Sequence, residues 1–89
     1  HLDCYHLSDV TAELSHGNWL LHLGGPRPKV VNVGSRDLFL VPKDVKRGFA
    51  AVHPAEAVAA DFPAVLADLR KRAGKAKRVW LDLDVDALD

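Results

Sequence analysis

At the end of the chain, a short apolar run is followed directly by aspartates at alternate positions. Residues 79–81 read VWL, and residues 82–89 read DLDVDALD. Because successive side chains of a β-strand alternate between its faces, Asp82, Asp84 and Asp86 would share one face of a strand. Such carboxylates repel one another unless a cation or hydrogen-bond donors offset their charge. Oxygen-rich sites of this kind suit magnesium, calcium or manganese, so the pattern predicts a strand that holds a metal ion.

The composition is that of an ordinary soluble protein. The chain has 12 basic and 12 acidic residues, and this balance does not favour a nucleic-acid partner. No apolar stretch approaches the roughly 20 residues that a membrane span requires, so we expect no membrane partner. The single cysteine, Cys4, argues against a disulfide scaffold and fits the reducing cytoplasm, which is the predicted location.

The first two thirds of the chain predict a short helix and brief strands. Trp19, Leu20 and Leu23 share a helical face. The β-branched residues 29–34 predict a strand that ends in glycine, and residues 49–52 predict a second one. Pro54 then predicts the start of a helix over residues 55–60, because proline suits the first turn of a helix.

The clearest predicted element is the helix that follows Asp61. Asp61 is a good N-cap, and Gly74 suits the end of the helix. Apolar residues recur at i, i+3, i+4 and i+7, namely Phe62, Val65, Leu66 and Leu69. A predicted strand over residues 78–83 completes an alternation of strand, helix and strand, which is typical of a parallel α/β sheet. Since ligands collect at the carboxyl ends of such strands, Asp3, Asp84 and Asp86 would meet there.

Four short motifs occur along the chain in a fixed order. They are His1-Leu2-Asp3-Cys4, Ser15-His16-Gly17-Asn18, Val33-Gly34-Ser35-Arg36-Asp37 and the run of residues 82–89. This order resembles the ureohydrolase family of arginases, agmatinases and formiminoglutamases. The resemblance implies a three-layer α/β fold, a parallel sheet flanked by helices, that holds two manganese ions bridged by hydroxide. Residues 1–89 would be the central part of such a domain, which would continue beyond both ends.

The resemblance also implies a function. Asp3, Asp84 and Asp86 match family metal ligands, and His16 matches the histidine that shuttles protons in arginases, a role that suits imidazole. The expected reaction is manganese-dependent hydrolysis of a guanidino or amidine C–N bond, which releases urea or a related amide. The substrate would be a small guanidino compound or an arginine-containing peptide. The full-length protein would be a homo-oligomer, and we expect no activity from residues 1–89 alone.

The first motif departs from the family pattern. Aligned without a gap from Asp3, the expected ligand histidine falls on Tyr5 and the expected second aspartate falls on Leu7. A slip of one residue offers His6, and a further slip offers Asp9. The predicted metal ligands are Asp3, His6, Asp84 and Asp86, with His16 as the catalytic residue. The alternative is that the site has lost ligands and binds one metal ion or none.

Two other functions compete with the hydrolase. A catalytically inactive family member acting as a binding or assembly module fits Tyr5 and Leu7. A magnesium-dependent phosphoryl or glycosyl transfer enzyme could also use an Asp-x-Asp motif, although the chain lacks a glycine-rich phosphate loop. Outside these sites, we expect Trp19 and Trp80 in the core and a structural role for His53, which precedes a proline.

Overall fold

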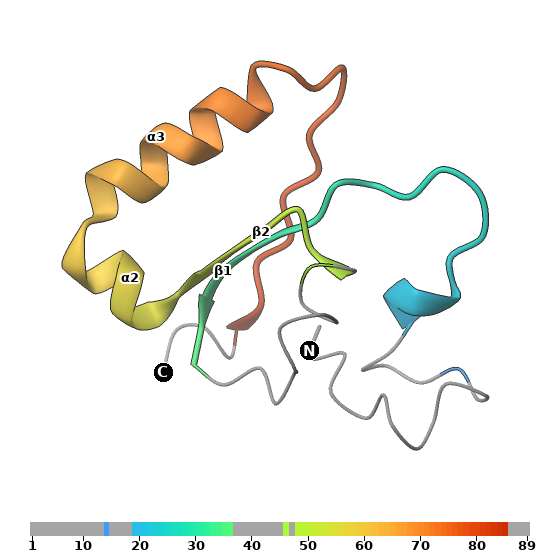
Figure 1. Cartoon of the computed structure of the whole chain (residues 1–89), viewed down its shortest axis with the longest axis horizontal. Helices are drawn as coiled ribbons and strands as arrows, with labels where there is room; N and C mark the ends of the chain where they lie inside the picture. The colour runs from blue at the N-terminus through green and yellow to red at the C-terminus, as the bar shows by residue number, and fades with distance from the viewer. Residues whose placement is uncertain (1–13, 15–18, 37–45, 47, 86–89) are drawn as a thin grey trace.

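A computed structural model describes residues 14, 19–36, 46 and 48–85 of the chain. The elements are the 3₁₀ helix η1 (Trp19–His22), the strands β1 (Val31–Ser35) and β2 (Ala51–Pro54), and the helices α2 (Ala55–Ala60) and α3 (Phe62–Ala73). Figure 1 shows β1 and β2 side by side, with α2 continuing from the end of β2 and α3 folding back from α2. The mixed α/β character predicted from the sequence is confirmed.

The two strands form a parallel pair, as the sequence predicts. Their register pairs Val31 with Ala51, Asn32 with Val52 and Val33 with His53, and an irregularity follows between Val33 and Ser35. Gly34 lies inside this irregularity with a φ of 83°, in the left-handed region that favours glycine. Glycine therefore allows β1 to bulge at its carboxyl end without the strain that a Cβ would add.

The core lies between η1 and one face of the sheet. Leu20 is 1% exposed and Phe49 is 6% exposed, and three partly buried residues pack on this pair: Leu23, Val30 and Val52. Asn32 pairs with Val52 in the sheet, so the two side chains share this face, and the buried Asn32 Oδ1 has no hydrogen-bond partner among the residues that the structure describes. The expected helical face at Leu20 and Leu23 thus packs on the core, whereas Trp19, expected in the core, is 40% exposed.

The helices begin and end where the sequence predicts. Pro54 is the N-cap of α2. Asp61 is the N-cap of α3, and its Oδ1 accepts a hydrogen bond of 3.0 Å from the Ala64 amide. Gly74 caps the C-terminus of α3. Along the predicted apolar stripe, Val65 is buried while Phe62 is exposed, so the helix is covered in the middle of its stripe and open at its start.

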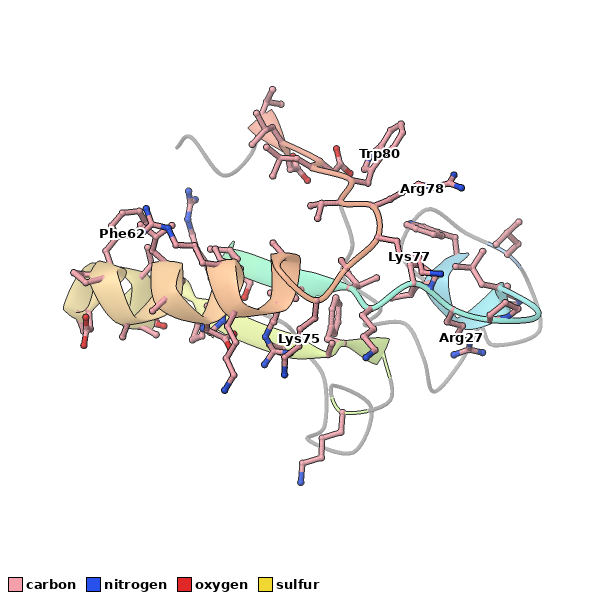
Figure 2. All side chains as sticks on the ribbon, turned by 90° about the horizontal axis from the view of Figure 1, so that it is seen from above. Arg27, Phe62, Lys75, Lys77, Arg78 and Trp80 are labelled. Atoms are coloured by element: carbon pink, nitrogen blue, oxygen red, sulfur yellow. The ribbon has the colours of Figure 1, made fainter. Side chains whose placement is uncertain are left out.

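The prediction of a strand over residues 78–83 is wrong for this structure. Residues 78–84 form neither helix nor strand. This part of the chain overlaps the strands in the view of Figure 1, and the perpendicular view of Figure 2 separates it from them. A strand satisfies its backbone only by pairing with a neighbour, and within the described residues β1 pairs with β2 alone. Trp80, predicted to lie in the core, is 92% exposed.

Candidate functional site

Asp84 is the one predicted metal ligand that falls within the described residues. Asp3, His6, His16 and Asp86 lie outside them, so their arrangement stays a prediction. Asp84 is exposed in the segment of residues 78–85, which we call the acidic segment. Among the residues that the structure describes, no three histidine, cysteine, aspartate or glutamate side chains come together as a metal site. The structure therefore describes one side chain of the predicted site and not its geometry.

The third sequence motif lies at the carboxyl end of a parallel strand. Gly34 and Ser35 close β1, and Arg36 follows them as an exposed residue. His53 and Pro54 close the neighbouring strand β2, so the two strands end at the same edge of the sheet. In parallel α/β sheets this edge is where ligands bind, because loops and helix N-termini converge there. The motif thus occupies the edge where the sequence argument expects a site.

A polar cluster joins β2 to α3, and we call it the His53 cluster. Its members are His53, Asp68 and Arg72. His53 Nε2 lies 2.9 Å from Asp68 Oδ2, and Arg72 Nε donates to the same oxygen at 2.6 Å. Arg72 Nη1 also donates to the Ala50 carbonyl oxygen at 3.2 Å. The cluster therefore connects the helix to His53 near the carboxyl end of β2 and to Ala50, the residue before the strand.

The electrostatics of the cluster determine which ring nitrogen of His53 carries a hydrogen. The hydrogen bond from Arg72 lowers the pKa of Asp68 below its ordinary value of 3.8, the hydrogen bond from His53 lowers it further, and partial burial opposes both. Asp68 is thus ionised at neutral pH, and an ionised carboxylate can only accept hydrogen bonds. We infer that His53 Nε2 carries a hydrogen and donates it to Asp68 Oδ2.

The sequence predicts a structural role for His53 but does not identify its two partners, Asp68 and Arg72. The available signal was the spacing of Asp68 and Arg72, which lie four residues apart on a predicted helix and therefore on one face of it. The partner on β2 could not be found this way, because the contact between His53 and Asp68 depends on how the helix folds back along the strand.

No protein-family model, curated protein or solved structure matches this chain. The described residues form a mixed α/β structure built on a parallel pair of strands. This structure and the His53 cluster do not indicate a more specific class of protein. No helix in the described part of the chain is both long enough and apolar enough to cross a membrane.

Proposed function

We propose that the chain is the central part of an arginase-like, three-layer α/β domain that hydrolyses a guanidino or amidine C–N bond with manganese. The main support is the order of the four motifs along the sequence. The third of them, around Gly34 and Arg36, closes a parallel strand at the edge where such folds bind ligands. The substrate is a small guanidino compound or an arginine-containing peptide, and the proposed location is the cytoplasm.

The donor set of this proposal fits manganese. Asp3, Asp84 and Asp86 offer carboxylate oxygens and His6 offers an imidazole nitrogen, which are ligand types that manganese accepts. Asp84 is exposed, so a cation can reach it from solvent. Manganese held by these residues would supply a water molecule of lowered pKa as the nucleophile. His16 would pass a proton to the leaving amine, because imidazole exchanges protons near neutrality.

The experiment that tests the proposal is elemental analysis of the full-length protein after manganese loading and removal of free metal. We expect about two manganese ions per chain, the number that a binuclear hydrolytic site uses. An Asp84→Ala, Asp86→Ala double variant should lose them. Asp82→Ala is the matched control, since Asp82 stands where the family has a serine, and it should retain them. Urea release from arginine, agmatine and arginine-containing peptides is then the assay of activity.

The same analysis separates the proposal from its two competitors. A folded protein that retains no manganese, zinc, iron or cobalt would rule out the hydrolase and favour a binding module, in which Tyr5 and Leu7 replace two ligands. Retention of magnesium in preference to manganese, together with phosphoryl or glycosyl transfer and no urea release, would favour the transfer enzyme.

A further inference from the structure

We propose that the His53 cluster is a positioning device that fastens the last turns of α3 to β2 and so determines where the acidic segment begins. The residues concerned are His53, Asp68 and Arg72. The link to Asp84 as a metal ligand rests on the proposed function. The fastening of α3 to β2 stands apart from it, because it follows from the contacts alone.

The two halves of α3 are held by different kinds of contact. In the first half, Val65 is buried, and α3 packs on α2. In the second half, Asp68 and Arg72 make polar contacts to His53 of β2 and to Ala50, the residue before β2. Apolar packing therefore holds the middle of the helix at Val65, and the cluster adds polar contacts that hold its second half to β2.

Asp68 is the centre of the cluster. One carboxylate oxygen, Oδ2, accepts from both Arg72 Nε and His53 Nε2, and bonds to an ionised acceptor are stronger than neutral ones. Arg72 Nη1 donates to the Ala50 carbonyl oxygen, so the Asp68 carboxylate also orients the guanidinium group toward the strand. Neutralising Asp68 should therefore weaken the contacts to His53 and to Ala50.

The end of α3 leads into the acidic segment after a short connection. The helix ends at Ala73, and the Gly74 amide donates to the Arg70 and Arg72 carbonyl oxygens. Beyond this point the chain reverses direction, and Figure 2 shows Arg78 and Trp80 lying apart from the strands. Arg72 thus belongs both to the contact with the strand and to the cap that directs the chain toward Asp82 and Asp84. Arg72 therefore links the start of the acidic segment to β2, the strand at whose carboxyl end we expect a ligand to bind.

The central test compares Asp68→Asn with the wild type by amide hydrogen exchange and by manganese affinity. Exchange of the amides at residues 70–73 should become about two- to fivefold faster, the change that a partly exposed ion pair supports. Exchange within α2 should stay unchanged. Manganese affinity of the full-length protein should fall by a similar factor of about two to five, because the segment that carries Asp84 starts from a less fixed position.

Two variants of His53 provide a matched control. A glutamine amide places its nitrogen near the position of imidazole Nε2, whereas the shorter asparagine places it near Nδ1. His53→Gln should therefore keep the slow exchange of residues 70–73, and His53→Asn should behave like Asp68→Asn. Nitrogen-15 NMR of the wild type should show the hydrogen on Nε2 of the neutral ring. A structural histidine that merely fills space would respond to both substitutions alike.

The pH dependence follows from the lowered pKa of Asp68. A group whose pKa is lower in the folded state stabilises the fold above its unfolded pKa, and this contribution is lost as the pH falls through the folded value. The groups that face Asp68 are His53 from β2 and Arg72 from its own helix. NMR titration should place the midpoint of Asp68 below 3.8, and an Arg72→Met variant should raise it.

Each outcome bears on a different part of the proposal. Unchanged exchange of residues 70–73 in Asp68→Asn would overturn the fastening of α3. Faster exchange with unchanged manganese affinity would overturn the positioning of Asp84. A wild-type protein that binds no manganese would overturn the proposed function and the positioning with it, and the exchange data would still decide whether the cluster fastens α3.

Discussion

Two regions of this chain have equally strong sequence patterns and opposite structural outcomes. In residues 51–73 the strand, both helices and their caps lie close to where the sequence predicts them. In the acidic segment, residues 78–85, the predicted strand is absent and the apolar side chains are exposed. A helix satisfies its backbone from within, whereas a strand depends on a neighbour for every hydrogen bond. A local sequence pattern is therefore enough to specify the helices of residues 51–73. The alternating pattern of residues 78–85 is compatible with a strand but does not specify one.

The largest difference in the free energy of unfolding should appear between alanine substitutions of one buried and one exposed leucine. Leu20 is 1% exposed beside Phe49, whereas Leu81 is 78% exposed in the acidic segment. Leu20→Ala should lower the free energy of unfolding by about 3 kcal/mol, because it removes buried apolar atoms and leaves a cavity. Leu81→Ala should change it by less than about 0.5 kcal/mol. Urea unfolding followed by circular dichroism measures both, and equal losses would mean that the acidic segment is packed after all.

A pair of valines should give a smaller contrast of the same kind. Val65 is 5% exposed on α3, and Val79 is 64% exposed just before Trp80. Val65→Ala should cost about 2 kcal/mol of unfolding free energy, and Val79→Ala should cost close to none. The same urea unfolding experiment applies. A small loss at Val65 would show that α3 depends on its polar contacts rather than on burial.

Capping of α3 should contribute less than burial. The Asp61 carboxylate accepts from the Ala64 amide, which otherwise has no partner within the helix. Asp61→Ala should therefore lower the free energy of unfolding by about 1 kcal/mol, and Asp61→Asn, which keeps an acceptor oxygen, should cost much less. Thermal unfolding of the two variants measures the difference. Equal losses would indicate that the charge, and not the hydrogen bond, stabilises the helix.

These contrasts show how far the sequence specifies the molecule. The caps at Pro54 and Asp61 act within a few residues, so their types alone predict the bounds of α2 and α3. The bulge at Gly34 depends on the pairing of β1 with β2, and the contact of His53 with Asp68 depends on the packing of α3 along β2. Both bring together parts of the chain that are distant in sequence, so no local pattern predicts them. The acidic segment fails as a strand for the same reason, since its alternating pattern does not say which neighbour it would pair with.

The same distinction between local patterns and long-range contacts applies to the candidate site. The spacing of Asp84 and Asp86 specifies which carboxylate ligands would share a face of a strand, and that prediction needs no other part of the chain. Bringing these aspartates to Asp3 and His6 needs a sheet whose strand order the sequence does not state. The site is therefore predicted as a set of residue types, and its geometry depends on pairing.

Substitution of Trp80 should also have little effect on stability, and this residue gives the most direct test of the comparison. Trp80 is 92% exposed and points away from the strands in Figure 2. Trp80→Ser should change the free energy of unfolding by less than about 0.5 kcal/mol, as an exposed side chain without packing does. Because the chain has 2 tryptophans, a Trp19→Phe variant leaves Trp80 as the single reporter of its surroundings.

In that Trp19→Phe variant, acrylamide should quench the fluorescence of Trp80 nearly as well as that of free tryptophan, and its emission should lie at long wavelength. The matched variant Trp80→Phe should report a partly shielded Trp19, since this residue is 40% exposed. Shielding of Trp80 in residues 1–89 would contradict the exposed segment. If the chain is part of a larger domain, as we propose, shielding that appears only in that domain would show that the acidic segment is covered there, because an apolar strand folds where a neighbour pairs its backbone and a second layer buries its side chains.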